Sequence, residues 1–95
     1  MDIIQEIDDY IRTIGGGYSY WYIGIASDPR DRLFNDHNVS KDNDDYIIRD
    51  SGSEVAARKV EKYFLNRGCD GGTGGGGDSS TRFAYAYKKN LHTRP

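Results

Sequence analysis

The chain has 95 residues, enough for one domain with a single modest hydrophobic core. A net charge of −2 excludes a strongly basic nucleic-acid coat protein, and one cysteine excludes an intramolecular disulfide. No apolar stretch is long enough to span a membrane, and the first residues lack the basic start of a secretion signal. We therefore expect a single domain over residues 1–95, a cytoplasmic location and no membrane partner.

Residues 2–14 predict an amphipathic helix. Isoleucines recur at positions 3, 7, 11 and 14, the spacing that places apolar side chains on one helical face. Asp2 and Gln5 form a capping box at its start, and three consecutive glycines end it. The helix is expected to cover one face of a sheet.

Residues 18–25, with the sequence YSYWYIGI, predict a strand. Aromatic and β-branched residues dominate this segment, and its alternation gives a pleated strand two distinct faces. A helix over residues 29–37 follows, because Asp28 is a suitable N-cap and Pro29 fits the first helical position. This helix places Arg32 in its first turns.

Residues 39–45 predict a solvated acidic loop, since they lack the ligand spacing of a calcium loop. A short strand over 46–50 and a helix over 52–67 follow, the helix starting at a capping box of Ser51 and Glu54. Glu61 lies on a partly apolar face of this helix. It is either a surface partner of Arg58 or a site residue.

Residues 69–81 form a glycine-rich loop that literally contains G-x-G-x-x-G. It leaves a helix and enters a strand, so we reject a dinucleotide-binding motif, which has the opposite order. The loop is either a flexible connector or a segment whose bare backbone approaches phosphate, with Gly74 at its centre. A strand over 82–88 and a frayed basic tail end the chain.

Several of these residues resemble the signature of the GIY-YIG nuclease family. Tyr22-Ile23-Gly24 matches the YIG strand, Arg32 follows Gly24 by eight positions, and Ala57 to Glu61 matches the Ala-x-x-x-Glu of the glutamate helix. The resemblance covers residues 18–67, but the GIY strand that should precede is missing. The strand 83–87 is expected to take its place, as in a circular permutation. The histidine also departs from the pattern, because His37 is five residues after Arg32 and points about 140° away on an α-helix.

The resemblance implies an α+β fold with a small three-stranded antiparallel sheet flanked by three helices. It further implies a metal-dependent phosphodiesterase acting on DNA or RNA, with Mg²⁺ held by Glu61. The catalytic candidates are Tyr22, Arg32, Glu61 and Tyr85, and the substrate-binding candidates are Tyr20, Arg30, His37, Gly74 and Lys88. Two alternatives stay open: a non-catalytic nucleic-acid-binding module that stacks bases on its tyrosines, and a protein-interaction domain.

Overall fold

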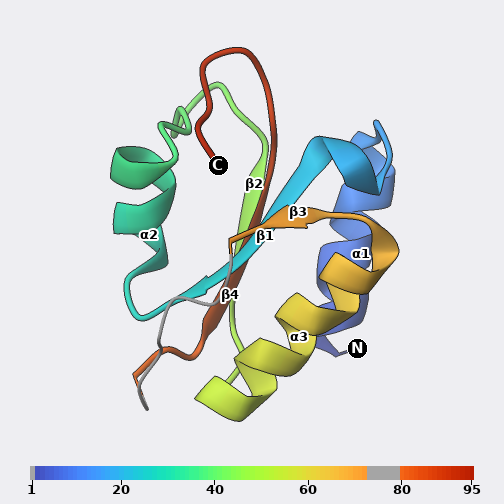
Figure 1. Ribbon diagram of the computed structural model, residues 1–95, viewed down its shortest axis with the longest axis vertical. Coiled ribbons are helices and arrows are strands. Elements are labelled where there is room, and N and C mark those ends of the chain that lie inside the picture. Colours follow the sequence, from blue (N-terminus) through green and yellow to red (C-terminus); the bar gives the residue numbers. More distant parts are fainter. Residues whose placement is uncertain (1, 73–79) are drawn as a thin grey trace.

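The computed structural model describes residues 2–72 and 80–95, and its fold belongs to the predicted α+β class (Figure 1). The helices are α1 (Ile3–Ile14), α2 (Pro29–Asp31), which continues as a π-helical turn (Arg32–Asp36), and α3 (Glu54–Arg67). The strands are β1 (Trp21–Ala26), β2 (Tyr46–Asp50), β3 (Asp70–Gly71) and β4 (Phe83–Lys88). Among the described residues, no helix is long and apolar enough to cross a membrane.

The strands form one sheet in the order β2-β4-β1-β3. The predicted pairing of strand 18–25 with strand 83–87 is confirmed, because β1 runs antiparallel to β4 with Tyr22 opposite Tyr87 and Gly24 opposite Tyr85. β2 is antiparallel to the other side of β4. The prediction of a three-stranded antiparallel sheet is wrong in one respect. The two residues of β3 add a fourth strand, parallel to β1, inside the segment that we expected to be only a loop.

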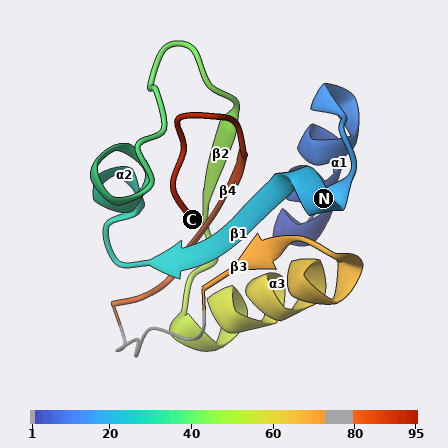
Figure 2. The same cartoon turned by 45° about the horizontal axis from the view of Figure 1, so that its top comes forward.

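The sheet separates two layers of helix (Figures 1 and 2). α1 and α3 cover one face, where Trp21, Ile23 and Ile25 of β1 pack with Phe64 of α3. α2 and its π-helical continuation cover the other face. The buried side chains there are Tyr22, Ala26, Leu33, Val39, Tyr85 and Tyr87. The period-2 alternation of β1 and β4 thus places Trp21, the isoleucines and Ala84 and Ala86 in one core, and the three tyrosines with Ala26 in the other.

The predicted capping of α1 is confirmed, because the Asp2 carboxylate accepts a hydrogen bond of 2.8 Å from the Gln5 N–H. α3 begins later than predicted. Ser53 rather than Ser51 caps it, accepting from the Ala56 N–H at 3.1 Å. Gly68, with φ of 112°, ends α3 as predicted.

The first strand also begins later than its alternating sequence predicts. Residues Tyr18–Tyr20 form one 3₁₀ turn, closed by a bond of 3.1 Å from the Tyr20 N–H to the Gly17 carbonyl. Gly17 has a φ of 85°, a conformation that turns the chain and interrupts an extended strand. Tyr20 therefore lies outside β1.

The segment after β4 is mostly exposed but is held by hydrogen bonds, which corrects the prediction of a frayed tail. In Figures 1 and 2 it turns back between α2 and the sheet. The Asp44 carboxylate accepts a hydrogen bond of 2.8 Å from the Asn90 amide and pairs with His92 at 2.5 Å. The Asn38 amide donates to the His92 carbonyl at 3.0 Å. These partners are distant in sequence, so local composition does not reveal them.

Candidate active site

A cleft lies along the edge of β1, between α3 and the segment that starts at α2. β3 pairs only with Tyr22 and Ile23, so the β1 edge from Gly24 onward has no neighbouring strand in residues 2–72 and 80–95. The cleft has a volume of about 40 Å³, room for a few water-sized groups. Its lining residues are Tyr22, Gly24, Ile25, Arg32, Arg58, Glu61, Gly72 and Tyr85.

This cleft brings together the four residues that the sequence suggested as catalytic. Tyr22 comes from β1 and Tyr85 from the neighbouring β4, whereas Arg32 begins the π-helical turn and Glu61 lies on α3. The structure therefore places two hydroxyls, one guanidinium and one carboxylate around one space.

Gly24 is needed in this site because the Tyr85 ring occupies the space above it. A Cβ atom at Gly24 would lie 2.5 Å from both Cζ and Oη of Tyr85, a distance that real Cβ contacts do not reach. The glycine of the Tyr-Ile-Gly motif thus allows the phenol of the next strand to reach the cleft. Its role here is a close side-chain approach, not an unusual backbone angle.

The tyrosines form a stacked cluster with a buried histidine. The Tyr22 ring centroid lies 5.1 Å from that of Tyr87 and 4.6 Å from that of His37. The Tyr85 hydroxyl and His37 Nε2 are 2.7 Å apart. Tyr85 and His37 are only 2% and 6% exposed.

Burial also sets the protonation of this cluster. It is the main cause that raises the pKa of Tyr22, and a hydrogen bond from the Gly72 backbone only partly offsets it. Burial and the neighbouring Tyr22 raise the pKa of Tyr85. The pKa of His37 is lowered, again mainly by burial. Neutral phenols and a neutral imidazole are therefore the resting forms at pH 7.

Glu61 is half-buried and faces the cleft. Burial raises the pKa of its carboxyl group, and the positive charge of Arg58 lowers it by a smaller amount. Arg58 is itself held by Glu54, with guanidinium nitrogens 3.0 and 3.1 Å from one carboxylate oxygen. Within the described part of the chain, the Glu61 carboxylate has no hydrogen bond or ion pair, so its oxygens are available to a ligand.

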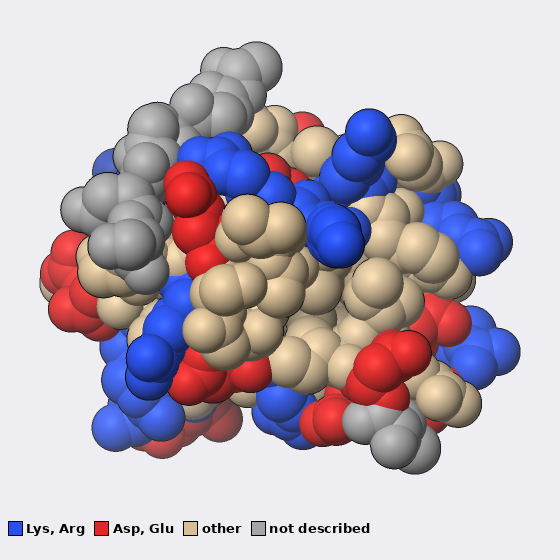
Figure 3. Space-filling model, turned by 90° about the horizontal axis from the view of Figure 1, so that it is seen from below, with Lys and Arg blue, Asp and Glu red and all other residues tan. Residues whose placement is uncertain are grey.

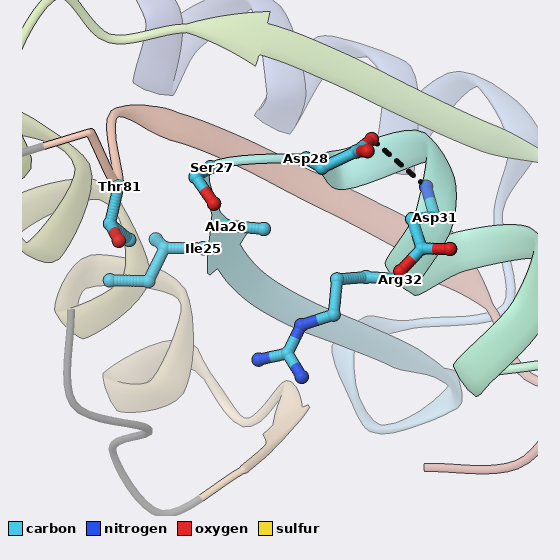
Figure 4. Close-up of a pocket in the computed structure, with 7 residues that line it drawn as sticks. All are labelled: Ile25, Ala26, Ser27, Asp28, Asp31, Arg32 and Thr81. Carbon is cyan, nitrogen blue, oxygen red and sulfur yellow. Dashed lines mark hydrogen bonds between the residues drawn. The ribbon is translucent and has the colours of Figure 1, made fainter. Parts of the chain in front are cut away.

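Arg32 can reach a ligand from the other side of the cleft. Its side chain is 47% exposed, and its ion pair with Asp36 is long at 3.5 Å. Figure 4 shows the guanidinium extending from α2 across β1, toward the side on which α3 lies. The same arginine lines a second cavity of about 200 Å³ with Ser27, Asp28, Asp31 and Thr81.

The residues of the cleft can supply only part of the coordination shell of a Mg²⁺ ion. Among residues 2–72 and 80–95 there is no group of three His, Cys, Asp or Glu side chains that could form a complete cage. Mg²⁺ commonly keeps several waters and takes one or two carboxylates together with substrate phosphate oxygens. Glu61, with its unpaired carboxylate in the cleft, is compatible with that arrangement.

The other predicted substrate-binding residues do not converge on the cleft. Tyr20 is 58% exposed and lies with Lys88 beside Gly16. Lys88 is paired with Trp21, at the opposite end of β1, about 13 Å from Ile25 for a rise of 3.3 Å per residue. Arg30 lines another cavity, with Tyr10 and β2. His37 lies behind Tyr85 rather than in the cleft, and Gly74 falls outside the described residues.

Sequence reasoning assigned no site role to Arg58 or to the backbone of Arg94. Arg58 had a signal, since it lies three positions before Glu61 on one helix. The Arg94 carbonyl had none, because it meets His37 across 57 residues. Comparison with protein-family models, with curated proteins and with solved structures gave no match.

Proposed function

We propose that this protein is a metal-dependent phosphodiesterase that acts on DNA or RNA, with a GIY-YIG-like site in which the C-terminal strand replaces the missing first strand. One observation carries the proposal: Tyr22, Arg32, Glu61 and Tyr85, from four separate segments, line one cleft. Phosphodiester hydrolysis needs charge neutralisation and an oriented water molecule, and these side chains supply the groups for both.

Arg32 is the phosphate-binding residue of the proposed site. Its guanidinium offers several N–H donors to phosphate oxygens. The long contact with Asp36 leaves it free to change partner when a phosphate enters. As the negative charge grows on the phosphate oxygens in the transition state, this arginine stabilises it.

Glu61 is the proposed metal ligand. A Mg²⁺ ion held there would supply Lewis-acid stabilisation of the phosphate charge. Glu61 must be ionised to bind the ion, and Arg58 favours that ionised form from the same helix. The pair of Arg58 with Glu54 keeps the arginine from neutralising Glu61 by direct contact.

Tyr22 and Tyr85 are the proposed water-positioning residues. Their rings stack at a centroid distance of 6.4 Å, and both line the cleft. Because burial raises their pKa values, neither hydroxyl ionises spontaneously at pH 7. A tyrosine that removes a proton from water therefore needs a neighbouring proton acceptor, and Tyr85 has His37 at 2.7 Å.

Few positive charges are available to bind the substrate. Figure 3 shows basic and acidic side chains interspersed on one face of the molecule rather than separated into a basic surface. The cations that line the cleft are Arg32 and Arg58, and a net charge of −2 gives the chain no general attraction for phosphate.

The test is cleavage of end-labelled single-stranded and duplex DNA and RNA in the presence of Mg²⁺, Mn²⁺ or a chelator. We expect metal-dependent cleavage that Glu61→Gln reduces to a small residual rate. The matched control is Asp42→Asn, which removes an exposed carboxylate from the α2–β2 connection and should leave the rate unchanged. Circular dichroism establishes that both variants are folded. A folded Glu61→Gln chain that cleaves at the wild-type rate would disprove the proposal.

A further inference from the structure

The last residues of the chain hold His37 through its main chain and its ring together. The Arg94 N–H donates to the His37 carbonyl at 2.7 Å, and the Arg94 carbonyl lies 2.7 Å from His37 Nδ1. The Tyr87 hydroxyl donates to the same Arg94 carbonyl at 3.0 Å. The other ring nitrogen, Nε2, faces the Tyr85 hydroxyl at 2.7 Å.

These contacts determine which nitrogen of the neutral imidazole carries the proton. A carbonyl oxygen can only accept, so a contact of 2.7 Å with Arg94 requires a proton on Nδ1. The Tyr87 hydroxyl also approaches Nδ1, but at 3.2 Å, and its shorter bond is to the Arg94 carbonyl. That oxygen therefore accepts two hydrogen bonds, one for each lone pair. Nε2 is left without a proton and must accept from the Tyr85 O–H.

We infer that residues 90–95 are a working part of the active site: the backbone carbonyl of Arg94 holds His37 in the tautomer that accepts the proton of Tyr85. The inference rests on the proposed function, in which Tyr85 handles the attacking water. Arg94 is a positioning residue, because it acts on the reaction only through His37. Its side chain has no part in this role.

The proton balance of the step is simple. The O–H bond of Tyr85 breaks and an N–H bond forms at His37 Nε2, which leaves a tyrosinate beside an imidazolium. The tyrosinate then takes a proton from the water that attacks the phosphorus atom. As the new P–O bond forms, the P–O bond to the leaving oxygen breaks, and the Nε2 proton of His37 balances the proton that this oxygen takes up. Nδ1 keeps its proton throughout, and the Arg94 carbonyl accepts from it in both states, so the acceptor stabilises the imidazolium when it forms.

Burial opposes the formation of an imidazolium at His37, and the Arg94 carbonyl is the contact that favours it most. Burial lowers its pKa most, the Arg94 carbonyl raises it, and the charges of Arg32 and Asp36 oppose one another. Tyr22, Tyr85 and Tyr87 complete the groups that face the ring, and burial keeps all three neutral. His37 is thus a neutral proton acceptor at rest.

The remaining contacts of the segment explain how its position is maintained. Asp44 binds both Asn90 and His92, and Asn38 binds the His92 carbonyl. None of the four residues in these contacts, Asn38, Asp44, Asn90 and His92, lines the cleft. They can be altered without changing any side chain of the proposed site.

The experiment is ¹⁵N NMR of the histidine rings, which reports the tautomer directly, combined with cleavage assays. Three variants are compared with the full chain: a chain that ends at Leu91, Asp44→Ala, and Arg94→Ala, which keeps the carbonyl. In the full chain and in Arg94→Ala we expect the proton of His37 on Nδ1. In the shortened chain we expect the Nε2–H form to appear and cleavage to fall by about 10²-fold, the usual scale of acid–base catalysis.

The outcomes separate this inference from the proposed function. A proton on Nε2 in the full chain would overturn it, as would a folded shortened chain that keeps both the Nδ1–H form and full activity. If the shortened chain fails to fold, Asp44→Ala provides the same comparison by loosening the segment. A full chain with the Nδ1–H form that cleaves no substrate would contradict the proposed function and not the assignment of the tautomer.

Discussion

The N–H of His37 donates to the carbonyl of Arg32, five residues earlier, at 2.8 Å. This i→i+5 bond belongs to the π-helical turn after α2, and it corrects the expectation that the two residues diverge by about 140°. The wider turn places His37 one turn above Arg32, so that both approach the same tyrosines. Arg32 enters the cleft beside Tyr22 and Tyr85, and His37 stacks on Tyr22 and binds Tyr85.

Gly24→Ala should damage both stability and the site. The new methyl group would overlap the Tyr85 ring, and overpacking of a close-packed core typically costs about 1–3 kcal/mol. Urea unfolding measures this cost. The double variant Gly24→Ala/Tyr85→Ala removes the ring that clashes, so the effect of the alanine should largely disappear in that background. Equal costs in both backgrounds would mean that Tyr85 does not occupy this space.

The parts of the fold that the sequence predicts well have local causes. The helix over residues 2–14 follows from its isoleucine spacing and its Asp2 cap, and the pairing of β1 with β4 follows from two tyrosine-alternating segments that need partners. The two-residue strand β3 could not be predicted, because Asp and Gly have low strand propensity and only the position of β1 recruits them. The 3₁₀ turn over Tyr18–Tyr20 could not be predicted, because the alternating pattern begins before the strand does.

Some residues of the candidate site could likewise be predicted from the sequence, and others could not. The motif spacing led to Tyr22, Arg32 and Glu61, and the expected strand pairing led to Tyr85. Placing His37 required the π-helical turn, whose extra residue per turn is not apparent from composition. Placing Arg94 required contacts across 57 residues. Three of the eight tyrosines, Tyr22, Tyr85 and Tyr87, are buried, so their ring faces are not open to bases, whereas Tyr20 is exposed.

Stability should fall as the pH drops below about 6.5, through the titration of His37. Its folded-state pKa is lowered by burial, so the unfolded chain binds the proton more readily and acid favours unfolding. Urea midpoints measured between pH 7.5 and 5 should therefore decrease in the wild type. His37→Gln cannot titrate and should show a shallower decrease over this range. Parallel curves for the two chains would contradict a neutral buried His37.

Arg58→Ala should shift the acid limb of cleavage to higher pH. Arg58 lowers the pKa of Glu61, so its removal raises that pKa further and Glu61 is protonated at a higher pH than in the wild type. The pH dependence of kcat/KM reports the change, and the Glu61 side-chain carbonyl signal in ¹³C NMR reports it without any assay of cleavage. Arg58→Lys keeps the charge and is the control. An unchanged acid limb in Arg58→Ala would show that Arg58 does not affect the pKa of Glu61 during cleavage.

Binding of nucleic acid should depend only moderately on salt. The cations of the cleft are Arg32 and Arg58, and each neutralised duplex phosphate contributes a slope of about −0.9 in log K against log salt. We therefore expect a slope of log K against log salt of about −2 in electrophoretic or fluorescence titrations. Lys89 adds little, because it does not line the cleft. A slope steeper than about −5 would indicate a broad basic surface outside the cleft.

The most direct test of the central claim is a double-mutant cycle on cleavage with Arg32→Ala and Glu61→Gln. Groups that act on one phosphate in one cleft are strongly non-additive, because the loss of either disables the same step. We expect each single variant to lose about 10³-fold or more in rate, and the double variant to lose little beyond the worse single variant. Independent, multiplying losses, or full activity in either single variant, would show that Arg32 and Glu61 do not form one catalytic site.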